Sequence, residues 1–305
     1  MFAYHNVGVA CLDVLLKHGV NVPLVVTHVD NPNETIWFDS VARFAKQRGI
    51  PTATPADSNS DAFLKQLRTL APDFIFSFYY RQMLVPALLA TATRGAFNMH
   101  GSLLPKYRGR VPINWAIING ETETGATLHE MVEKPDSGRI VGRQAVTIGP
   151  DETAEEVFGK VTAAAASVLD TALPRLIAGT AVLETQDLSK GSYFGGRRAE
   201  DGVIDWNAPA ENIHNLVRAV APPYPGATTS INGEIVKITK TKRMPPVFTH
   251  ANQAHWNIAN DKVIALCGQG TMLRILEAEI NGQPHNELML AVHLGTGIHA
   301  LDSPR

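Results

Sequence analysis

The feature that most constrains this chain is an alternation of short apolar segments with helical segments through its first two thirds. Strands are expected at Val22 to His28, Phe74 to Ser77 and Gly95 to His100, with helices at Thr35 to Arg48 and Asp61 to Leu70 between them. A strand, a helix and a further strand in succession place the two strands parallel, with the helix against the sheet. We therefore expect an α/β fold: a Rossmann-like, mostly parallel sheet with helices on both faces.

The pattern changes after His100. A loop punctuated by glycine and proline follows, and the helix that begins after Asp151 carries a capping box formed by Thr153 and Glu156. The remaining elements expected in this part are a short helix at Asn114 to Asn119, strands at Ala126 to Val132 and Arg139 to Ile148, and the capped helix itself, which runs towards Gly179.

The last third is a different kind of region. Asn232-Gly233 is a strong signal for a two-residue β-hairpin, and it separates strands at Ala227 to Ile231 and Glu234 to Thr239. Further strands are expected at Lys262 to Cys267 and Thr271 to Ala278. These short strands indicate a small OB-like β-barrel. We expect a catalytic domain at 1–188, a linker at 189–202 and the β-rich domain at 203–305.

Charge and composition exclude several classes of protein. The chain has 27 Lys and Arg against 29 Asp and Glu, a formal net charge of −2, so it lacks the basic excess that drives nucleic-acid binding. Cys11 and Cys267 form no disulfide framework or cysteine zinc site. The longest apolar stretch, 161–179, is interrupted by Asp170, Pro174 and Arg175, and the N-terminus has no signal-peptide pattern. We expect a cytoplasmic protein without membrane insertion.

The densest group of polar residues follows one predicted strand. Strand alternation puts Asn98 and His100 on the same face, at the carboxyl end where open α/β sheets bind ligands. Taken alone, the pair fits two interpretations equally well: a ligand site, or side chains that satisfy the backbone of the following loop.

The residues after this strand extend the pattern. Asn98-Met99-His100-Gly101 leads into Ser102-Leu103-Leu104-Pro105-Lys106-Tyr107-Arg108-Gly109-Arg110, and Asp136-Ser137-Gly138 follows downstream. This string resembles the signature of the folate-dependent formyltransferase family. Further segments resemble the branch that formylates UDP-4-amino-4-deoxy-L-arabinose: 2–5, 27–32, 76–81 and 120–125.

The resemblance implies transfer of a formyl group from 10-formyltetrahydrofolate to an amine. Asn98 would donate its side-chain NH2 to the oxyanion of the tetrahedral intermediate. His100 would act as general base and then as acid, and Asp136 would orient the imidazole and stabilise its charged form. By itself Asp136 would more simply be a turn cap.

The resemblance also implies where the donor binds. Pterin recognition uses mainly backbone groups, and the residues expected to line the folate site are Gln82, Met83, Leu84, Arg110, Val132, Glu133, Lys134, Pro135 and Asp136. Met83 and Leu84 fit a core position equally well, and Arg110 fits a solvated loop.

For the acceptor, we expect a nucleotide-linked amino sugar. Arg197 and Arg198 stand in a glycine-bearing loop suited to a diphosphate, because guanidinium groups match phosphate oxygens. Arg218 and Tyr224 are further candidates for acceptor binding. The resemblance implies a role in lipid A modification and polymyxin resistance.

Two alternatives share part of this pattern. Methionyl-tRNA formyltransferase has the same catalytic residues, and a local basic cluster at Lys237, Lys240, Lys242 and Arg243 keeps it open despite the net charge. The other alternative is a non-catalytic folate or nucleotide-sugar binding module. The histidines show no metal-binding spacing, so no metal is expected. The sequence carries no signal for oligomeric state.

Overall fold

The computed structural model describes residues 1–32, 34–245 and 254–301. Their contacts divide the chain into two compact units. The N-terminal unit comprises 1–112, 123–147 and 158–195, and the C-terminal unit comprises 113–122, 148–157 and 196–305. The chain therefore enters the C-terminal unit twice before residue 196, at points that no shift in composition marks.

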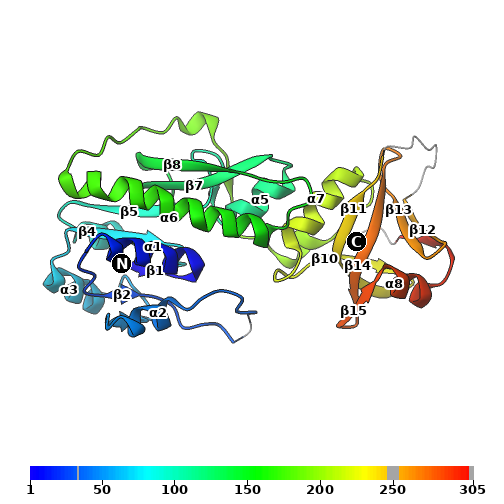
Figure 1. Cartoon of the computed structure of the whole chain (residues 1–305), viewed down its shortest axis with the longest axis horizontal. Helices are drawn as coiled ribbons and strands as arrows, with labels where there is room; N and C mark the ends of the chain where they lie inside the picture. Colours follow the sequence, from blue (N-terminus) through cyan, green and yellow to red (C-terminus); the bar gives the residue numbers. More distant parts are fainter. Residues whose placement is uncertain (33, 246–253, 302–305) are drawn as a thin grey trace. The chain divides into compact units, whose positions relative to one another are not determined.

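A seven-stranded sheet forms the centre of the N-terminal unit (Figure 1). Its order is β3-β2-β1-β4-β5-β7-β8, parallel from β3 to β5 and antiparallel from β5 to β8. The Rossmann-like, mostly parallel sheet expected from the sequence is confirmed. The strands are β1 (Phe2–Ala3), β2 (Val25–Val26), β3 (Thr52–Ala53), β4 (Phe74–Phe78), β5 (Gly95–His100), β7 (Glu123–Glu130) and β8 (Ile140–Thr147).

Helices pack on this sheet because each has one apolar face. Phe63, Leu64 and Leu67 of α3 are buried in a cluster with Phe2 of β1 and Ile75 of β4. In Figure 1, α1 and α6 lie in front of the strands. The helices are α1 (His5–Lys17), α2 (Val41–Gln47), α3 (Asp61–Leu70), α4 (Pro86–Leu89) and α6 (Ala154–Ala178).

Helix α2 is shorter than the sequence predicts. It begins at Val41, after Ser40 caps it by accepting a hydrogen bond from the Arg43 amide. The preceding residues are not helical: Trp37 and Phe38 direct their rings against His5 at the start of α1, with ring centroids 4.5 Å and 3.9 Å from the imidazole. Tertiary packing of the aromatic side chains therefore overrides local helix propensity at this point.

Helix α6 begins with the predicted capping box. The Thr153 amide donates to Glu156 Oε2 at 2.8 Å, and the Glu156 amide donates to Thr153 Oγ1 at 3.4 Å. By length and apolar composition alone, α6 is the one described helix that could cross a membrane. It buries Val157, Val161 and Leu169 among other residues, as a core helix of an α/β domain does.

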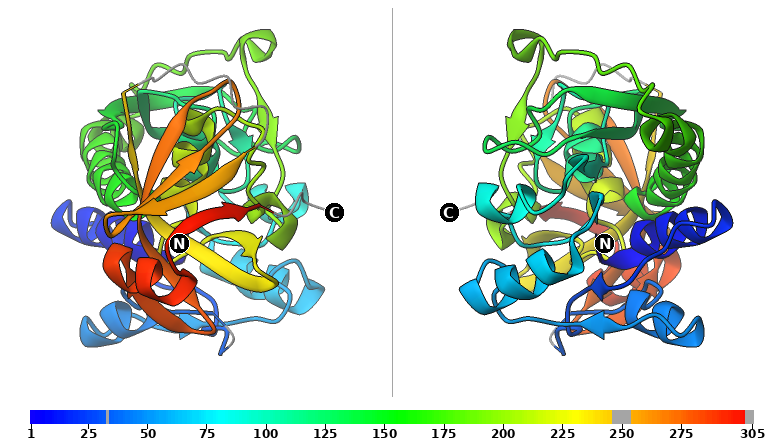
Figure 2. Two further views of the ribbon diagram at one scale, coloured as in Figure 1. Left: turned by 90° about the vertical axis from the view of Figure 1, so that its right-hand side faces the viewer. Right: turned by 90° about the vertical axis from the view of Figure 1, so that its left-hand side faces the viewer.

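The C-terminal unit contains a curled antiparallel sheet of order β10-β11-β14-β13-β12-β16, with β15 beside β14 (Figure 2). A bridge between Ile231 and Leu301 links the two ends of this order, as in a barrel. The predicted hairpin is confirmed, with left-handed backbone at Asn232 and Gly233. Its elements are α5 (Pro112–Ile118), α7 (Ala210–Val220), β10 (Ala227–Ile231), β11 (Glu234–Arg243), β12 (His255–Ala259), β13 (Lys262–Leu266), β14 (Met272–Ile280), β15 (Gln283–Asn286), α8 (Glu287–Leu294) and β16 (Gly297–Ala300).

Two short strands lie outside both large sheets. β6 (Arg108–Gly109) pairs in parallel with β9 (Tyr193–Phe194), and Tyr107 stacks on Phe194 with ring centroids 5.3 Å apart. The second of these strands falls in the segment expected to be a linker. This pairing holds the loop that follows β5 against the segment 193–194.

His5 is the buried end of the aromatic cluster around α1. Its side chain lies between Phe38 and the Phe158 ring, whose centroid is 4.4 Å from the imidazole. Burial lowers the pKa of His5 from 6.5 to about 3, and the Arg81 cation adds to the effect. His5 is therefore neutral in the folded protein. Between pH 6.5 and 3 the unfolded chain binds a proton at His5 that the folded chain does not. The free energy of unfolding therefore decreases as the pH is lowered through this range.

We expect the free energy of unfolding, measured with urea, to fall more between pH 7.5 and pH 5.0 in the wild type than in His5→Asn. The expected difference is about 2 kcal/mol, from a folded pKa near 3 against an ordinary histidine in the unfolded chain. Asparagine tolerates the positive φ of 66° at this position. An equal loss in both proteins would show that His5 is not kept neutral by burial.

Candidate functional site

The polar residues predicted after β5 lie at the place where the large sheet changes from parallel to antiparallel. Asn98 and His100 sit on β5, and the antiparallel register places Asn98 directly opposite His129 of β7. Directly opposed side chains on one face of a sheet are close neighbours. The amide nitrogen of Asn98 is 3.2 Å from Nε2 of His129.

Asp136 completes the group, which we call the polar cluster: Asn98, His100, His129 and Asp136. Its Oδ1 is 3.6 Å from His100 Nδ1 and 3.4 Å from His129 Nε2, and its Oδ2 accepts a hydrogen bond from the Gly109 amide at 2.9 Å. The structure thus brings together the three residues expected to act on the substrate, and adds His129.

The carboxylate of Asp136 is held ionised. Burial by itself would raise the pKa of Asp136. The positive charge that His100 and His129 carry when protonated, the hydrogen bond that Nε2 of protonated His129 donates and the amide of Gly109 together hold it well below its usual range. A permanent negative charge therefore lies beside two imidazoles, of which His100 is 6% and His129 1% exposed.

The contacts of His100 define which ring nitrogen is free to exchange a proton. Nε2 lies 2.7 Å from the carbonyl oxygen of Tyr107, which can only accept, so Nε2 carries a hydrogen. Nδ1 is then the basic nitrogen of the neutral ring. It lies beyond hydrogen-bond distance of Asp136, but near enough for the carboxylate to stabilise a proton that Nδ1 takes up.

His129 is the residue of the cluster that was not assigned from the sequence. Its Nδ1 donates to the Glu130 carbonyl at 2.7 Å, so Nε2 of the neutral ring carries a lone pair. In the neutral ring this lone pair can accept from the side-chain NH2 of Asn98, which orients the amide, whereas in the protonated ring Nε2 carries a hydrogen that faces Asp136. The sequence does not show this contact, because it depends on the antiparallel register that pairs Asn98 of β5 with His129 of β7.

The loop after β5 is tied to β7. Thr127 Oγ1 donates to the Ser102 carbonyl at 2.6 Å and accepts from the Leu104 amide at 3.2 Å. Ser102 Oγ donates to the Lys106 carbonyl at 2.6 Å. These hydrogen bonds, of which the two of Thr127 are buried, set the course of the chain that brings the Tyr107 carbonyl to His100.

The Asp-x-Gly motif has a steric explanation. A β-carbon on Gly138 would stand 2.1 Å from the Glu130 carbonyl oxygen at the end of β7. Only glycine allows this close approach of the two backbones. Asp136 itself has a φ of 51°, a left-handed conformation that aspartate adopts more readily than most residues. Together these residues turn the chain so that the carboxylate faces the histidines.

The residues expected at the folate site occupy two loops beside one buried cluster. Leu84 is a member of that cluster and Met131 packs against it, so the loops that begin there run close to each other. Gln82 Nε2 donates to the Ala56 carbonyl and its Oε1 accepts from the Ser58 amide. Met83 is exposed. Val132, Glu133, Lys134 and Arg110 are exposed, and Pro135 is half-buried.

The residues expected to bind the acceptor all belong to the C-terminal unit. Arg218 is 6% exposed and donates from Nη1 to the carbonyls of Gly149 and Glu152, so it cross-links α7 to the segment before α6. Arg197 donates to the Asp201 carbonyl, and the Arg198 amide donates to the Asp201 carboxylate. Burial raises the pKa of Tyr224 to about 12. The role of these four residues in acceptor binding stays a prediction.

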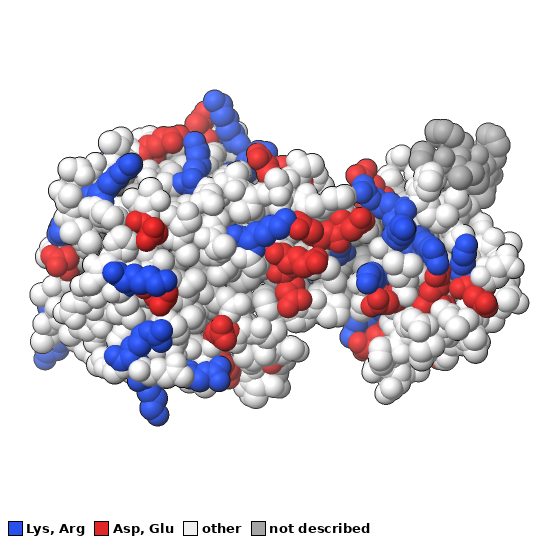
Figure 3. Space-filling model, in the orientation of Figure 1, with Lys and Arg blue, Asp and Glu red and all other residues white. Residues whose placement is uncertain are grey.

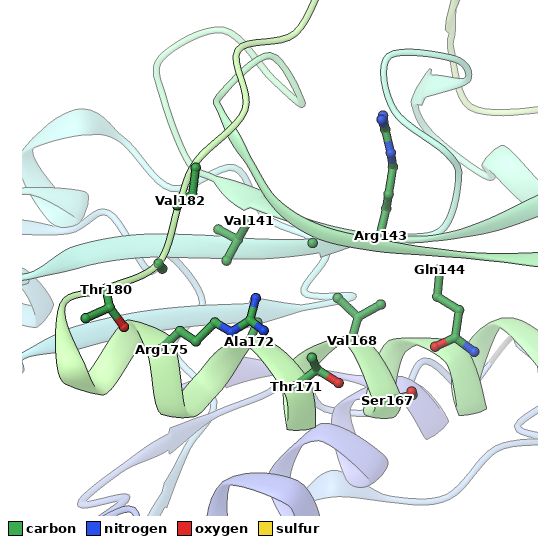
Figure 4. Close-up of a pocket in the computed structure, with 12 residues that line it drawn as sticks. Val141, Arg143, Gln144, Ser167, Val168, Thr171, Ala172, Arg175, Thr180 and Val182 are labelled. Carbon is green, nitrogen blue, oxygen red and sulfur yellow. The ribbon is translucent and has the colours of Figure 1, made fainter.

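A surface pocket of about 360 Å³ lies elsewhere in the N-terminal unit (Figure 4). Val141 and Val168 point into the space between β8 and α6, and no member of the polar cluster lines it. Among the described residues there is no group of three or more His, Cys, Asp and Glu side chains that could hold a metal ion. The chemistry of the polar cluster is that of proton transfer and hydrogen bonding.

We expect Gly138→Ala to destabilise the fold by about 1–3 kcal/mol, because the added methyl group collides with backbone rather than with a movable side chain. Gly159→Ala is the matched control: a β-carbon at this position of α6 meets nothing within 4 Å, so the change should raise stability by up to about 1 kcal/mol. Thermal unfolding of both variants measures the effect. An unchanged melting temperature in Gly138→Ala would contradict the close approach.

Comparison with known proteins agrees with this geometry. Residues 8–173, more than half of the chain, match the family model described as formyl transferase, and residues 197–287 match the model of the formyl transferase C-terminal domain. The matched N-terminal range includes all four residues of the polar cluster.

Solved structures share the fold. WlaRD, a sugar 3N-formyl transferase crystallised with dTDP and 5-N-formyl-THF, has a TM-score of 0.70 at 21% identity, over 92% of this chain and 96% of that one. An N-formyltransferase from Helicobacter canadensis, in complex with folinic acid and dTDP-3-aminofucose, gives the same TM-score and identity over 93% and 98%. A sugar N-formyltransferase from Shewanella sp. has a TM-score of 0.62 at 18% identity over 78% and 94%. From its family match and its polar cluster, the chain belongs to the formyl transferase family.

Proposed function

We propose that this protein transfers a formyl group from 10-formyltetrahydrofolate to the amine of a nucleotide-linked amino sugar, specifically UDP-4-amino-4-deoxy-L-arabinose. The observation that carries the proposal is the polar cluster at the carboxyl end of β5, inside a formyl transferase domain. The reaction would take place in the cytoplasm and serve lipid A modification, and through it resistance to polymyxin.

His100 supplies the proton transfers. The neutral amine attacks the formyl carbon, and Nδ1 of His100 takes the proton that the attacking nitrogen must lose. Asp136 stabilises the imidazolium that results. His100 then returns the proton to N10 of the folate as the carbon–nitrogen bond breaks, so the leaving group departs as neutral tetrahydrofolate.

Asn98 stabilises the negative charge that forms between these steps. Its NH2 group has two hydrogens, and His129 accepts one of them. The other can face the oxygen of the tetrahedral intermediate. Because His129 fixes the direction of the amide before substrate binds, little reorganisation is needed when the charge develops.

The choice of acceptor has two supports. Two of the structural relatives are described with dTDP or a dTDP-amino sugar together with a formylated folate. The resemblance of segments 2–5, 27–32, 76–81 and 120–125 to the aminoarabinose branch narrows the sugar within this class.

The basic cluster of β11 favours this acceptor over a tRNA. Lys237 and Lys240 point at the carboxylates of Glu279 and Glu277 on β14, at 2.9 Å and 3.2 Å, and Arg243 is 3.7 Å from Glu211. On the face seen in Figure 3, basic and acidic side chains are interspersed. Three of the four cations of the cluster therefore face carboxylates, which reduces the positive charge that the cluster offers to phosphates.

Purified protein given 10-formyltetrahydrofolate should formylate UDP-4-amino-4-deoxy-L-arabinose faster than dTDP-linked amino sugars. His100→Ala should lower kcat by at least about 100-fold, because it removes the proton carrier, with ligand affinity little changed. Mass spectrometry of the product and initial rates provide the measurement. Formylation of initiator methionyl-tRNA in preference to every amino sugar would overturn the proposal.

His129→Ala should lower kcat about 10- to 100-fold and leave KM for both substrates within about twofold, because Asn98 loses the acceptor that orients it. His129→Gln, which can still present an acceptor to Asn98, should recover part of the loss. A change in KM alone would mean that His129 contributes to binding rather than to orientation of Asn98.

A further inference from the structure

Arg108 is a buried residue whose guanidinium forms no hydrogen bond or ion pair with any described residue. It is 9% exposed, and its Nε is fully buried without a hydrogen-bond partner. Its backbone amide donates to Ser192 at the start of the β6–β9 pairing, but within 1–32, 34–245 and 254–301 its guanidinium forms no hydrogen bond or ion pair. A guanidinium carries five N–H donors, and the described residues offer its buried Nε no acceptor.

A buried charge is costly unless something pairs with it. The other buried arginine among the described residues, Arg218, donates to Asn215 and to two carbonyls. Arg197 also has a buried Nε without a partner, but its Nη2 donates to the Asp201 carbonyl. Arg108 has neither kind of partner among the described residues, which points to a partner outside them.

Arg108 is adjacent in sequence to two residues that contact the polar cluster, but its own side chain forms no hydrogen bond or ion pair with the cluster. The two peptides that flank it contact the cluster through the Tyr107 carbonyl, which accepts from His100, and the Gly109 amide, which donates to Asp136. The groups that lower the pKa of Asp136 are His100, His129 and Gly109, and Arg108 is not among them. The Arg108 guanidinium therefore forms no ion pair with Asp136.

Open space lies at the end of the same pair of strands. β6 and β9 are parallel and end together, with Arg110 after one strand and Gly195 after the other. A β-carbon on Gly195 would meet nothing within 4 Å. The end of β9, at Gly195, is therefore open.

We propose that Arg108 binds a phosphate of the nucleotide-linked acceptor and that this anion is its missing partner. The inference rests on the proposed function. In an amino sugar linked through its anomeric oxygen to a diphosphate, only the sugar ring separates the reacting amine from the first phosphate. A cation one residue away from the contacts that hold His100 and Asp136 is placed to receive that phosphate, and a guanidinium can bind two of its oxygens at once.

The test compares Arg108→Met with the wild type, using UDP, uridine and inorganic pyrophosphate as probes in calorimetry and thermal unfolding. Removal of an unpaired buried charge should leave the melting temperature of the ligand-free protein unchanged or higher. Affinity for UDP should fall about 10- to 100-fold, as when a charged hydrogen bond is lost, while affinity for uridine stays the same. Arg108→Lys, which keeps the charge without the fork, should retain part of the affinity for UDP.

Arg94→Met is the matched control. It deletes an arginine that has carbonyl partners, so it should lower the melting temperature and leave UDP binding unchanged. Undiminished UDP affinity in Arg108→Met, or equal losses for UDP and uridine, would overturn the proposal. A further outcome separates the two proposals. If pyrophosphate binding depends on Arg108 but the wild type formylates no nucleotide sugar, Arg108 is confirmed as an anion-binding residue and the proposed acceptor is wrong.

Discussion

The buried carboxylate of Asp136 is the interaction on which the site depends. Its pKa is held well below the usual range, against the effect of burial, by His100 and His129 in their protonated forms and by the amide of Gly109. Those three groups come from β5, β7 and β6, so the carboxylate is held only when all three strands are in register. The carboxylate in turn lies 3.6 Å from Nδ1 of His100, the nitrogen proposed to take up the proton.

Backbone groups do much of the positioning around this carboxylate. The Tyr107 carbonyl selects the tautomer of His100, the Glu130 carbonyl selects that of His129, and through His129 it orients the amide of Asn98. The loop that supplies the Tyr107 carbonyl is held to β7 by buried hydrogen bonds of Thr127. Because backbone carbonyls cannot titrate or change rotamer, they fix both rings more rigidly than side chains could.

Much of the fold could be predicted from residue pattern. The bounds of α3 and β5 agree with the sequence, and the Thr153–Glu156 capping box and the hairpin at Asn232-Gly233 are confirmed, because each rests on local chemistry. The sequence predicted a start for helix α2 at Thr35, whereas the helix begins at Val41. The aromatic residues before it, Trp37 and Phe38, pack against His5 of α1 and are not helical. The site was partly visible: motif spacing indicated Asn98, His100 and Asp136, and the structure places these three together.

The sequence by itself determined the α/β class, the strand end that carries the polar residues and the family resemblance, because periodicity and motif spacing are properties of neighbouring residues. Only the tertiary structure decided three further features. His129 lies against Asn98, Arg218 donates hydrogen bonds to carbonyls of its own unit, and the buried Nε of Arg108 has no hydrogen-bond partner among the described residues. Each of these depends on segments distant in the chain. Strand register and burial arise when the sheet is assembled, and no local pattern encodes which side chains then face each other.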